Sequence, residues 1–193
     1  MLYSGDFYCN NRLCFDVGGE MKKFRGSLLV CIMATAFLFS GCGLLDTKEP
    51  EVYGSFVTTD LYGNEVTEEI FAESKLTVVN VWATYCGPCI QEMPYLGELA
   101  EEYDSAQVQI VGIPTDVSNQ EYLEYALSIV EETGADYTHL LFSEELYHWG
   151  LSDIQYVPTT FFVDSNGKIT DTVVGSMSKE DWKELIDSKL ASM

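Results

Sequence analysis

The stretch LTVVNVWATYCGPC, residues 76–89, decides the fold. Its first part, 76–81, is a nearly continuous apolar run, which is typical of a central strand buried on both faces. From residue 88 to 103 the apolar residues recur at helical spacing instead. The cysteine pair that separates the two patterns therefore lies where a strand ends and a helix begins.

Cysteines placed at such a junction can carry out redox chemistry. Cys86 falls at the helix start, where unsatisfied N–H groups and the helix dipole favour a thiolate. Cys89 follows one turn later on the same face, close enough to close a disulfide. Gly87-Pro88 suits the first turn, because proline lacks the N–H that would be unpaired there. We expect an exposed, nucleophilic Cys86 and a shielded Cys89 that resolves a mixed disulfide.

The elements around this junction indicate one α/β domain. Parallel strands with helical crossovers, followed by an antiparallel pair, predict a mixed central sheet with helices on both faces. A turn at 63–64 predicts an N-terminal β-hairpin before the sheet. The other elements are expected as strands at 53–59, near 66, at 108–113, 139–142, 159–164 and 169–174, and as helical segments at 119–133, 144–149 and 178–190.

The first 41 residues differ from the rest of the chain. In 21–41, three basic residues precede a short apolar run and a pair of small residues, which is typical of an export signal. A run of twelve apolar-leaning residues is too short for a membrane-spanning helix, which needs about 20. Residues 1–20 contain acidic residues and precede a second methionine, Met21. We interpret 1–20 as a non-native extension and expect translation to start at Met21.

The end of this signal resembles a bacterial lipoprotein signal. Phe39-Ser40-Gly41-Cys42 is similar to a lipobox, with Phe39 in place of the usual leucine. The resemblance implies a signal peptide at 21–41 and a lipidated Cys42 as the mature amino terminus. Residues 42–52 would then be a short lipid-anchored linker, since two or more acyl chains suffice for stable anchoring. An ordinary signal peptide with an incidental cysteine is the alternative.

Charge and cysteine count limit the other roles. From residue 42 onward, the chain has six lysines and 28 acidic residues, so nucleic-acid binding is not expected. The acidic surface is interpreted as a solvated face. A CxxC pair can be half of a zinc site, but that site needs a second pair, and no metal is expected. A structural disulfide is possible in an exported protein, although so short a loop stabilises little.

Three motifs resemble the TlpA/ResA-like branch of the thioredoxin family. WATYCGPC, residues 82–89, is similar to the thioredoxin active-site motif, with Tyr85 where a second tryptophan is usual. QEMPYL, residues 91–96, is similar to the exported branch. So is Asn80, because cytoplasmic thioredoxins have a buried aspartate at that position. The resemblance covers 53–190 and implies a thioredoxin-like domain at 53–193.

The same resemblance implies the roles of several site residues. VPTT, residues 157–160, matches a family segment in which the proline is cis and lies against the cysteines. Pro158 would then be cis, and the backbone of Val157 would pair with a substrate strand. Gly175 matches a glycine that lets substrate approach, although a plain turn glycine is the alternative. Supporting roles at the cysteine pair are implied for Trp82, Tyr85, Gly87 and Pro88.

Asn80 cannot take a proton from Cys89 as an aspartate would. The proton acceptor is therefore expected to be Glu92 or water.

The implied function is that of a thiol–disulfide oxidoreductase anchored on the extracytoplasmic side of the cell membrane. Gly87-Pro88 between the cysteines favours a reductase of protein disulfides, with no cofactor beyond the Cys86–Cys89 pair. Electrons would come from a membrane thiol transporter of the CcdA/DsbD type. Targets in this branch are the haem-attachment cysteines of apocytochrome c, methionine sulfoxide reductases or other surface proteins.

Two other classes of function stay open. A thiol peroxidase of the same fold would need a peroxide-reducing cysteine in an earlier loop, and residues 57–69 contain none. A binding lipoprotein with an inert disulfide predicts that replacing both cysteines leaves ligand binding unchanged.

Overall fold

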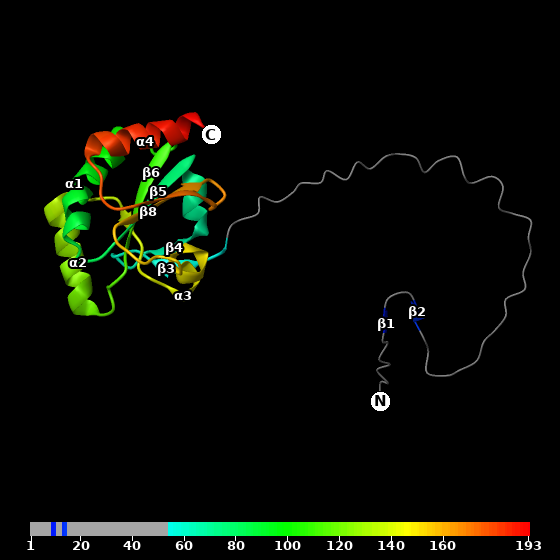
Figure 1. The fold of residues 1–193 in the computed structure, drawn as a ribbon. Coiled ribbons are helices and arrows are strands. Elements are labelled where there is room, and N and C mark those ends of the chain that lie inside the picture. Colours follow the sequence, from blue (N-terminus) through cyan, green and yellow to red (C-terminus); the bar gives the residue numbers. More distant parts are fainter. Residues whose placement is uncertain (1–8, 11–12, 15–53) are drawn as a thin grey trace, which may run out of the picture. The chain divides into compact units, whose positions relative to one another are not determined.

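A computed structural model describes residues 9–10, 13–14 and 54–193 (Figure 1). The chain divides into two units, residues 1–46 and 47–193. In the first, two short strands pair antiparallel, β1 (Cys9–Asn10) with β2 (Leu13–Cys14). The predicted signal peptide at 21–41, Cys42 and the linker at 42–52 lie outside the described residues, as does most of the predicted extension.

The second unit is built on the mixed five-stranded sheet that the sequence predicts. Its strand order is β7-β6-β5-β8-β9, with β5 in the centre and buried along its whole length. The first three strands run parallel, and β8 and β9 run antiparallel to their neighbours. The strands are β5 (Leu76–Trp82), β6 (Val108–Pro114), β7 (Thr138–His139), β8 (Thr159–Asp164) and β9 (Ile169–Val174).

Helices cover one face of this sheet. Both parallel crossovers step in the same direction along the sheet, so right-handed connections place their two helices on the same side. The apolar residues of these helices pack with the sheet in two clusters, one around the cysteine pair and one around Trp182. The helices are α1 (Gly87–Glu102), α2 (Gln120–Thr133) and α4 (Lys179–Ala191).

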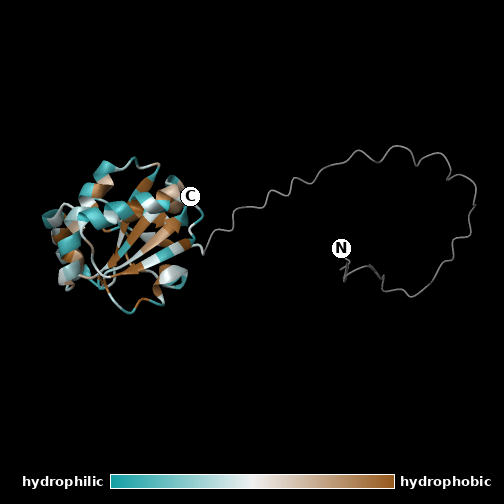
Figure 2. Ribbon diagram, turned by 45° about the horizontal axis from the view of Figure 1, so that its top comes forward, coloured by the Kyte–Doolittle hydropathy of each residue, from teal (hydrophilic) through white to brown (hydrophobic). Residues whose placement is uncertain are grey.

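Smaller elements cover the opposite face. The predicted hairpin and three short helical segments enclose a third cluster, in which Phe56, Phe71 and Trp149 pack together. Figure 2 shows hydrophobic strands inside and hydrophilic helix surfaces outside. The elements are β3 (Val57–Thr59), β4 (Glu65–Thr67), η1 (Glu68–Glu73), α3 (Glu144–Leu146) and the π-helical turn η2 (Tyr147–Leu151).

Side-chain caps define where the helices begin. Asn119 accepts a hydrogen bond from the Tyr122 N–H at the start of α2, and Ser178 accepts one from the Asp181 N–H at the start of α4. Gly134 ends α2 in the left-handed conformation, with φ of 64°. These positions agree with the predicted boundaries.

The structure differs from the sequence prediction in three segments. The strand expected at 139–142 spans only Thr138–His139, because the next residues leave the sheet: the Leu141 N–H bonds to the carbonyl of Thr59. The first strand begins at Val57, and residues 54–56 are not in a strand. The 3₁₀ helix Glu68–Glu73 was not predicted.

Candidate active site

The cysteine pair lies at the amino terminus of α1, as the spacing predicts. Cys86 is the N-cap residue, and its sulfur accepts a hydrogen bond from the backbone N–H of Cys89, with an N···S distance of 3.2 Å. Pro88 occupies the first turn. The two cysteines form a disulfide, with their Cα atoms 5.3 Å apart. The local sequence therefore places one sulfur where the helix terminus stabilises negative charge.

The two cysteine residues differ in solvent exposure less than expected. Cys89 is fully buried, as predicted for a shielded residue, but Cys86 is only 6% exposed in the disulfide form. The neighbouring Tyr85 is instead highly exposed. Because only a small part of Cys86 is exposed, a reaction partner can contact this residue only over a small area.

A carboxylate holds the loop that precedes Cys86. Asp116, just beyond the end of β6, accepts hydrogen bonds from the backbone N–H of Thr84 at 3.1 Å and from its hydroxyl at 2.6 Å. The N–H of Cys86 bonds to the carbonyl of Ala83 at 3.0 Å. Sequence reasoning missed Asp116. Its position after the carboxyl end of a strand parallel to β5 is the signal that could have indicated it.

A buried histidine fixes the tryptophan of the motif. The indole Nε1 of Trp82 donates to Nδ1 of His139 at 3.2 Å, and Nε2 of His139 lies 3.0 Å from the carbonyl of Ala135. This arrangement requires a neutral ring with its proton on Nε2. Burial accordingly lowers the pKa of His139 to about 4. A Cβ on Gly112 would lie 2.0 Å from Nδ1 of His139, so only glycine leaves room for this ring.

Glu92 is buried inside the domain beneath the helix start. Its Oε1 accepts from the amide of Asn80 at 3.0 Å, and its Oε2 accepts from the indole of Trp182 and the backbone N–H of Met177. Burial raises the pKa of Glu92, although the three hydrogen bonds oppose this. Glu92 lies three residues after Cys89 on the helix face that enters the core. Sequence reasoning missed its partners Trp182 and Met177.

The loop before β8 has the conformation that the family resemblance implied. The Val157–Pro158 peptide bond is cis, and the carbonyl of Pro158 accepts from the N–H of Gly175 at 2.9 Å. Gly175 has a φ of 101°, which a residue with a side chain rarely adopts. Val157 packs against the cluster that contains Cys86 and Cys89. The structure therefore brings the two predicted loops together beside the cysteine pair.

Two further findings concern metals and membranes. Within the described part of the chain, His, Cys, Asp and Glu side chains do not gather in groups of three or more that could hold a metal ion. Among the helices of residues 54–193, none is long and apolar enough to cross a bilayer.

Known proteins similar to this chain share both the fold and the redox class. The Redoxin family model matches residues 46–188. A protein named thiol-disulfide oxidoreductase ResA, from Geobacillus thermodenitrificans, is 31% identical over 135 residues, which cover 69% of this chain and 73% of that protein. The protein of the same name from Geobacillus kaustophilus is 29% identical over 177 residues, covering 87% and 98% of the two chains.

Solved structures agree on the fold. A thiol:disulfide interchange protein of the thioredoxin family from Chlorobium tepidum TLS superimposes with a TM-score of 0.61 at 26% identity, covering 73% of this chain and 97% of that one. StoA from Bacillus subtilis gives 0.56 at 24% identity, covering 70% and 98%.

The cis-proline loop beside a helix-capping cysteine pair defines a thioredoxin-fold disulfide oxidoreductase. The chain belongs to the Redoxin family, within its TlpA/ResA-like branch, and is a thiol–disulfide oxidoreductase of the ResA type.

Proposed function

We propose that the dithiol form of this protein reduces protein disulfides on the extracytoplasmic side of the membrane. The observation that supports this most is the position of Cys86, whose sulfur caps α1 and accepts the N–H of Cys89. A thiolate at that position is stabilised by the helix terminus. A stabilised thiolate on the reduced protein is the species that attacks a disulfide.

The reaction proceeds in two exchanges. The Cys86 thiolate attacks one sulfur of the substrate disulfide, so that a Cys86–substrate bond forms and the first substrate sulfur leaves as a thiolate that takes up a proton. Cys89 then loses its proton and attacks the Cys86 sulfur, which releases the second substrate thiol. The substrate gains two electrons and two protons, and the protein is left with the Cys86–Cys89 disulfide.

Glu92 is proposed to receive the proton of Cys89. Both residues are buried on the inward face of α1, one turn apart, and burial raises the pKa of Glu92 towards a range in which it can exchange protons. Asn80, which donates to Glu92, cannot accept a proton itself. Water reaching the cysteine pair is the alternative acceptor.

The substrate chain is proposed to lie along the cis-proline loop. Val157 would offer its backbone to the substrate, with Pro158 holding the loop beside the cysteines. A Cβ added at Gly175 would have no other atom within 4 Å, so this side of the loop is open to an approaching chain. Tyr85, exposed next to Cys86, would contact the same chain.

Membrane attachment is proposed to occur through a lipid on Cys42. The support for it is the signal-like pattern at 21–41 and the short linker at 42–52. A membrane thiol transporter of the CcdA/DsbD type would then return electrons to the disulfide. The substrates would be haem-attachment cysteines of apocytochrome c, methionine sulfoxide reductases or other surface proteins. Replacing Cys42 by alanine should release the protein from the membrane fraction of expressing cells.

Two measurements test the direction of thiol–disulfide exchange and the reductase activity. The reduction potential of the Cys86–Cys89 pair, measured against glutathione, should be more negative than the glutathione couple, and the reduced protein should reduce insulin disulfides. The matched control is Cys86→Ser, which should lose this activity completely. A potential near that of DsbA, about −120 mV, would overturn the assignment as a reductase.

A further inference from the structure

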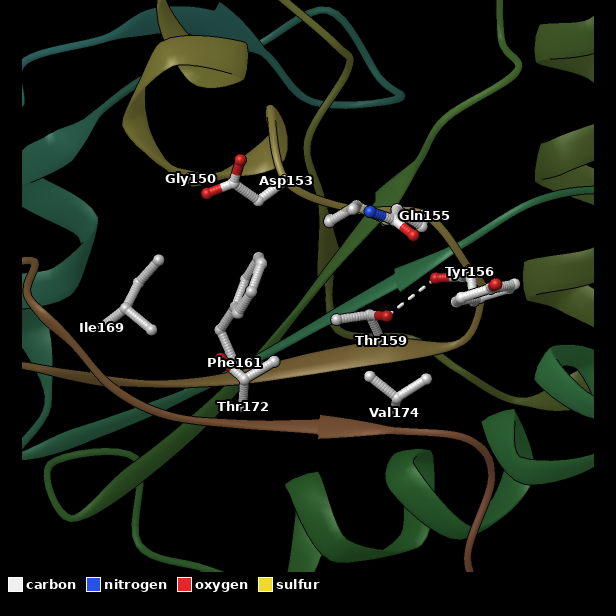
Figure 3. Close-up of a pocket in the computed structure, with 10 residues that line it drawn as sticks. Gly150, Asp153, Gln155, Tyr156, Thr159, Phe161, Ile169, Thr172 and Val174 are labelled. Carbon is white, nitrogen blue, oxygen red and sulfur yellow. Dashed lines mark hydrogen bonds between the residues drawn. The ribbon is translucent and has the colours of Figure 1, made fainter.

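An apolar pocket lies beside the cis-proline loop. It has a volume of about 470 Å³ and opens between the segment 150–156 and the face of β8 and β9. Figure 3 shows Phe161 and Val174 on the strand side and Tyr156 on the loop side. Tyr156 is 69% exposed and Val174 is 62% exposed. Large apolar side chains left open at a concave site indicate a binding surface rather than an incidental exposure.

The pocket is continuous with the proposed substrate-binding loop. Tyr156 and Thr159 line it and flank Val157–Pro158 in the chain, and the Thr159 hydroxyl donates to the carbonyl of Tyr156 at 2.7 Å. Val157 packs against two clusters, one that contains Cys86 and one that contains the pocket residue Phe161. The pocket therefore begins next to the residue that is proposed to pair with the substrate backbone.

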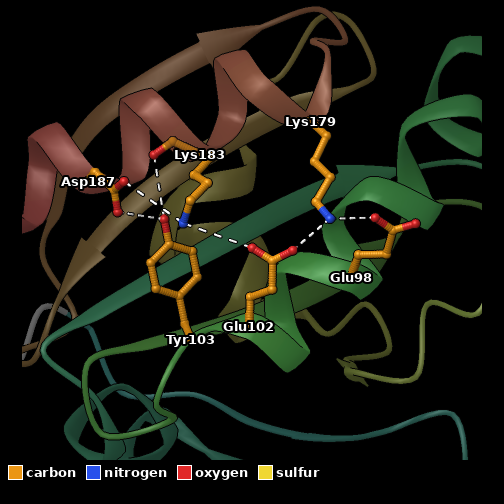
Figure 4. A network of polar contacts seen from close by, with 6 residues as sticks. All are labelled: Glu98, Glu102, Tyr103, Lys179, Lys183 and Asp187. Carbon is orange, nitrogen blue, oxygen red and sulfur yellow. Dashed lines mark hydrogen bonds and ion pairs between the residues drawn. The ribbon is translucent and has the colours of Figure 1, made fainter.

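Charge is distributed unevenly over the domain. Residues 54–193 carry five lysines and 25 acidic residues. Three of the lysines are in ion pairs. Lys179 and Lys183 pair with acidic residues of α1 and α4 (Figure 4). Lys189 pairs with Asp171.

The other two lysines lie far from the cysteines. Lys75 precedes β5 and Lys168 lies in the β8–β9 turn, so both are at the end of the sheet opposite Cys86. Seven residues of β5, about 23 Å, separate the two ends. Within the described residues, the end of the sheet that carries Cys86 thus has no lysine. The pocket runs along β9 from Val174 at that end to Ile169 next to Lys168, and Asp153 lines it. A negative field of this kind favours a cationic partner.

We propose that this pocket binds an apolar side chain of the substrate polypeptide, and that a lysine or arginine next to that side chain pairs with Asp153. The inference rests on the proposed function and specifies its substrate class. The pocket is large enough for one aromatic or branched aliphatic side chain, and its wall follows the loop with which the substrate backbone pairs. Recognition therefore combines backbone pairing at Val157, apolar burial and one charge contact.

Synthetic peptides test this proposal. Each carries one cysteine in a mixed disulfide with thionitrobenzoate and one dipeptide, Phe-Lys, Phe-Glu, Ser-Lys or Ser-Glu, placed one to six positions from that cysteine. Reaction with the pre-reduced protein releases peptide thiol and coloured thionitrobenzoate and leaves the protein disulfide. At the best position, Phe-Lys should react roughly tenfold faster than Ser-Lys, the lower end of what burying such a side chain provides. Phe-Lys should also react faster than Phe-Glu.

Variants locate the preference in the pocket. Val174→Asp should remove the preference for phenylalanine, and Thr172→Trp, which fills the pocket, should do the same. Asp153→Lys should reverse the preference for lysine over glutamate. The matched controls are Val57→Asp, a valine of similar exposure on β3, and Glu131→Lys at an exposed position of α2, and both should behave as the wild type.

A small disulfide substrate distinguishes a failure of the pocket assignment from a failure of the proposed function. Bis(2-hydroxyethyl) disulfide does not reach the pocket, so its rate should be the same in wild type and pocket variants. If it is reduced while all four peptides react alike, or if Val174→Asp retains the preference, the pocket assignment is wrong and the proposed function stands. If the wild type fails to reduce even this disulfide, the proposed function falls, and the pocket assignment falls with it.

Discussion

The indole of Trp182, near the start of α4, donates a hydrogen bond of 3.1 Å to the carboxylate of Glu92 on α1. Two other donors reach the same carboxylate, the amide of Asn80 on β5 and the N–H of Met177 before α4. One buried acid thus joins the sheet, the helix that carries the cysteines and the C-terminal helix. Its protonation state affects both stability and the proposed chemistry.

Replacing Glu92 by glutamine should alter the dependence of stability on pH. Burial raises the folded-state pKa of Glu92 above its ordinary value of 4.5, so the folded state holds a proton that the unfolded state has lost. Wild-type stability should therefore fall as the pH rises from about 4.5 through the raised pKa, and Glu92→Gln should lack this fall. Urea unfolding at a series of pH values measures it.

The same variant also tests the proposed proton transfer. Glu92→Gln should slow the attack of Cys89 on the mixed disulfide by at least tenfold, because a positioned base contributes roughly 10²–10⁴-fold. Glu101→Gln, an exposed residue on the same helix, is the control. An unchanged rate of the second exchange in Glu92→Gln would assign the proton to water instead.

The stability of the domain should fall in acid because the unfolded state takes up a proton at His139. Its folded-state pKa of about 4 lies below its ordinary value of 6.5, so the unfolded state binds a proton more readily. The contribution is fully present above pH 6.5 and is lost as the pH falls to 4. It amounts to about 3 kcal/mol, since one pKa unit corresponds to ~1.4 kcal/mol. His139→Phe should flatten the stability curve over this window, and equal slopes would contradict the neutral, buried ring.

Gly112 and His139 should be energetically coupled. A Cβ on Gly112 would lie 2.0 Å from Nδ1 of His139, so Gly112→Ala should destabilise the domain by about 1–3 kcal/mol. In a His139→Ala background the space is free, and the same substitution should cost much less. Urea unfolding of the four proteins gives the coupling energy. Additive costs would show that the ring moves away without penalty.

Asp116 should stabilise the loop before the cysteines. Asp116→Ala leaves the N–H and the hydroxyl of Thr84 without their acceptor, which should lower the free energy of unfolding by about 1–3 kcal/mol. Thr84→Val removes only the hydroxyl and should cost less. Chemical denaturation of the disulfide form measures both, and equal costs would mean that the backbone N–H contributes nothing.

Local patterns in the sequence predicted most of the architecture. The apolar run of β5, the helical spacing of α1 and the helical segments expected at 119–133 and 178–190 each depend on neighbours within a few residues, and the structure confirms them. The cis conformation of Pro158 was predicted only through the family resemblance, because about 5–6% of X–Pro bonds are cis.

Contacts across the fold were beyond sequence reasoning. Trp82 and His139 are 57 residues apart, and Trp182 and Glu92 are 90 apart. Such pairs form only when the packing of the sheet and helices brings them together, and periodicity carries no information on which distant residues meet. The end of β7 was misplaced for a similar reason, since residues 140–142 are apolar but the N–H of Leu141 bonds to Thr59 of the hairpin rather than extending the strand.

The acidity of the Cys86 thiol is the most direct test of the central claim. In reduced Cys89→Ser protein, the rate of alkylation by iodoacetamide against pH gives the pKa of Cys86 alone. Because Cys86 caps α1, this pKa should lie clearly below the value of about 8.5 for a free cysteine. A value of 8.5 or above would show that the helix terminus does not activate the sulfur and would contradict the account.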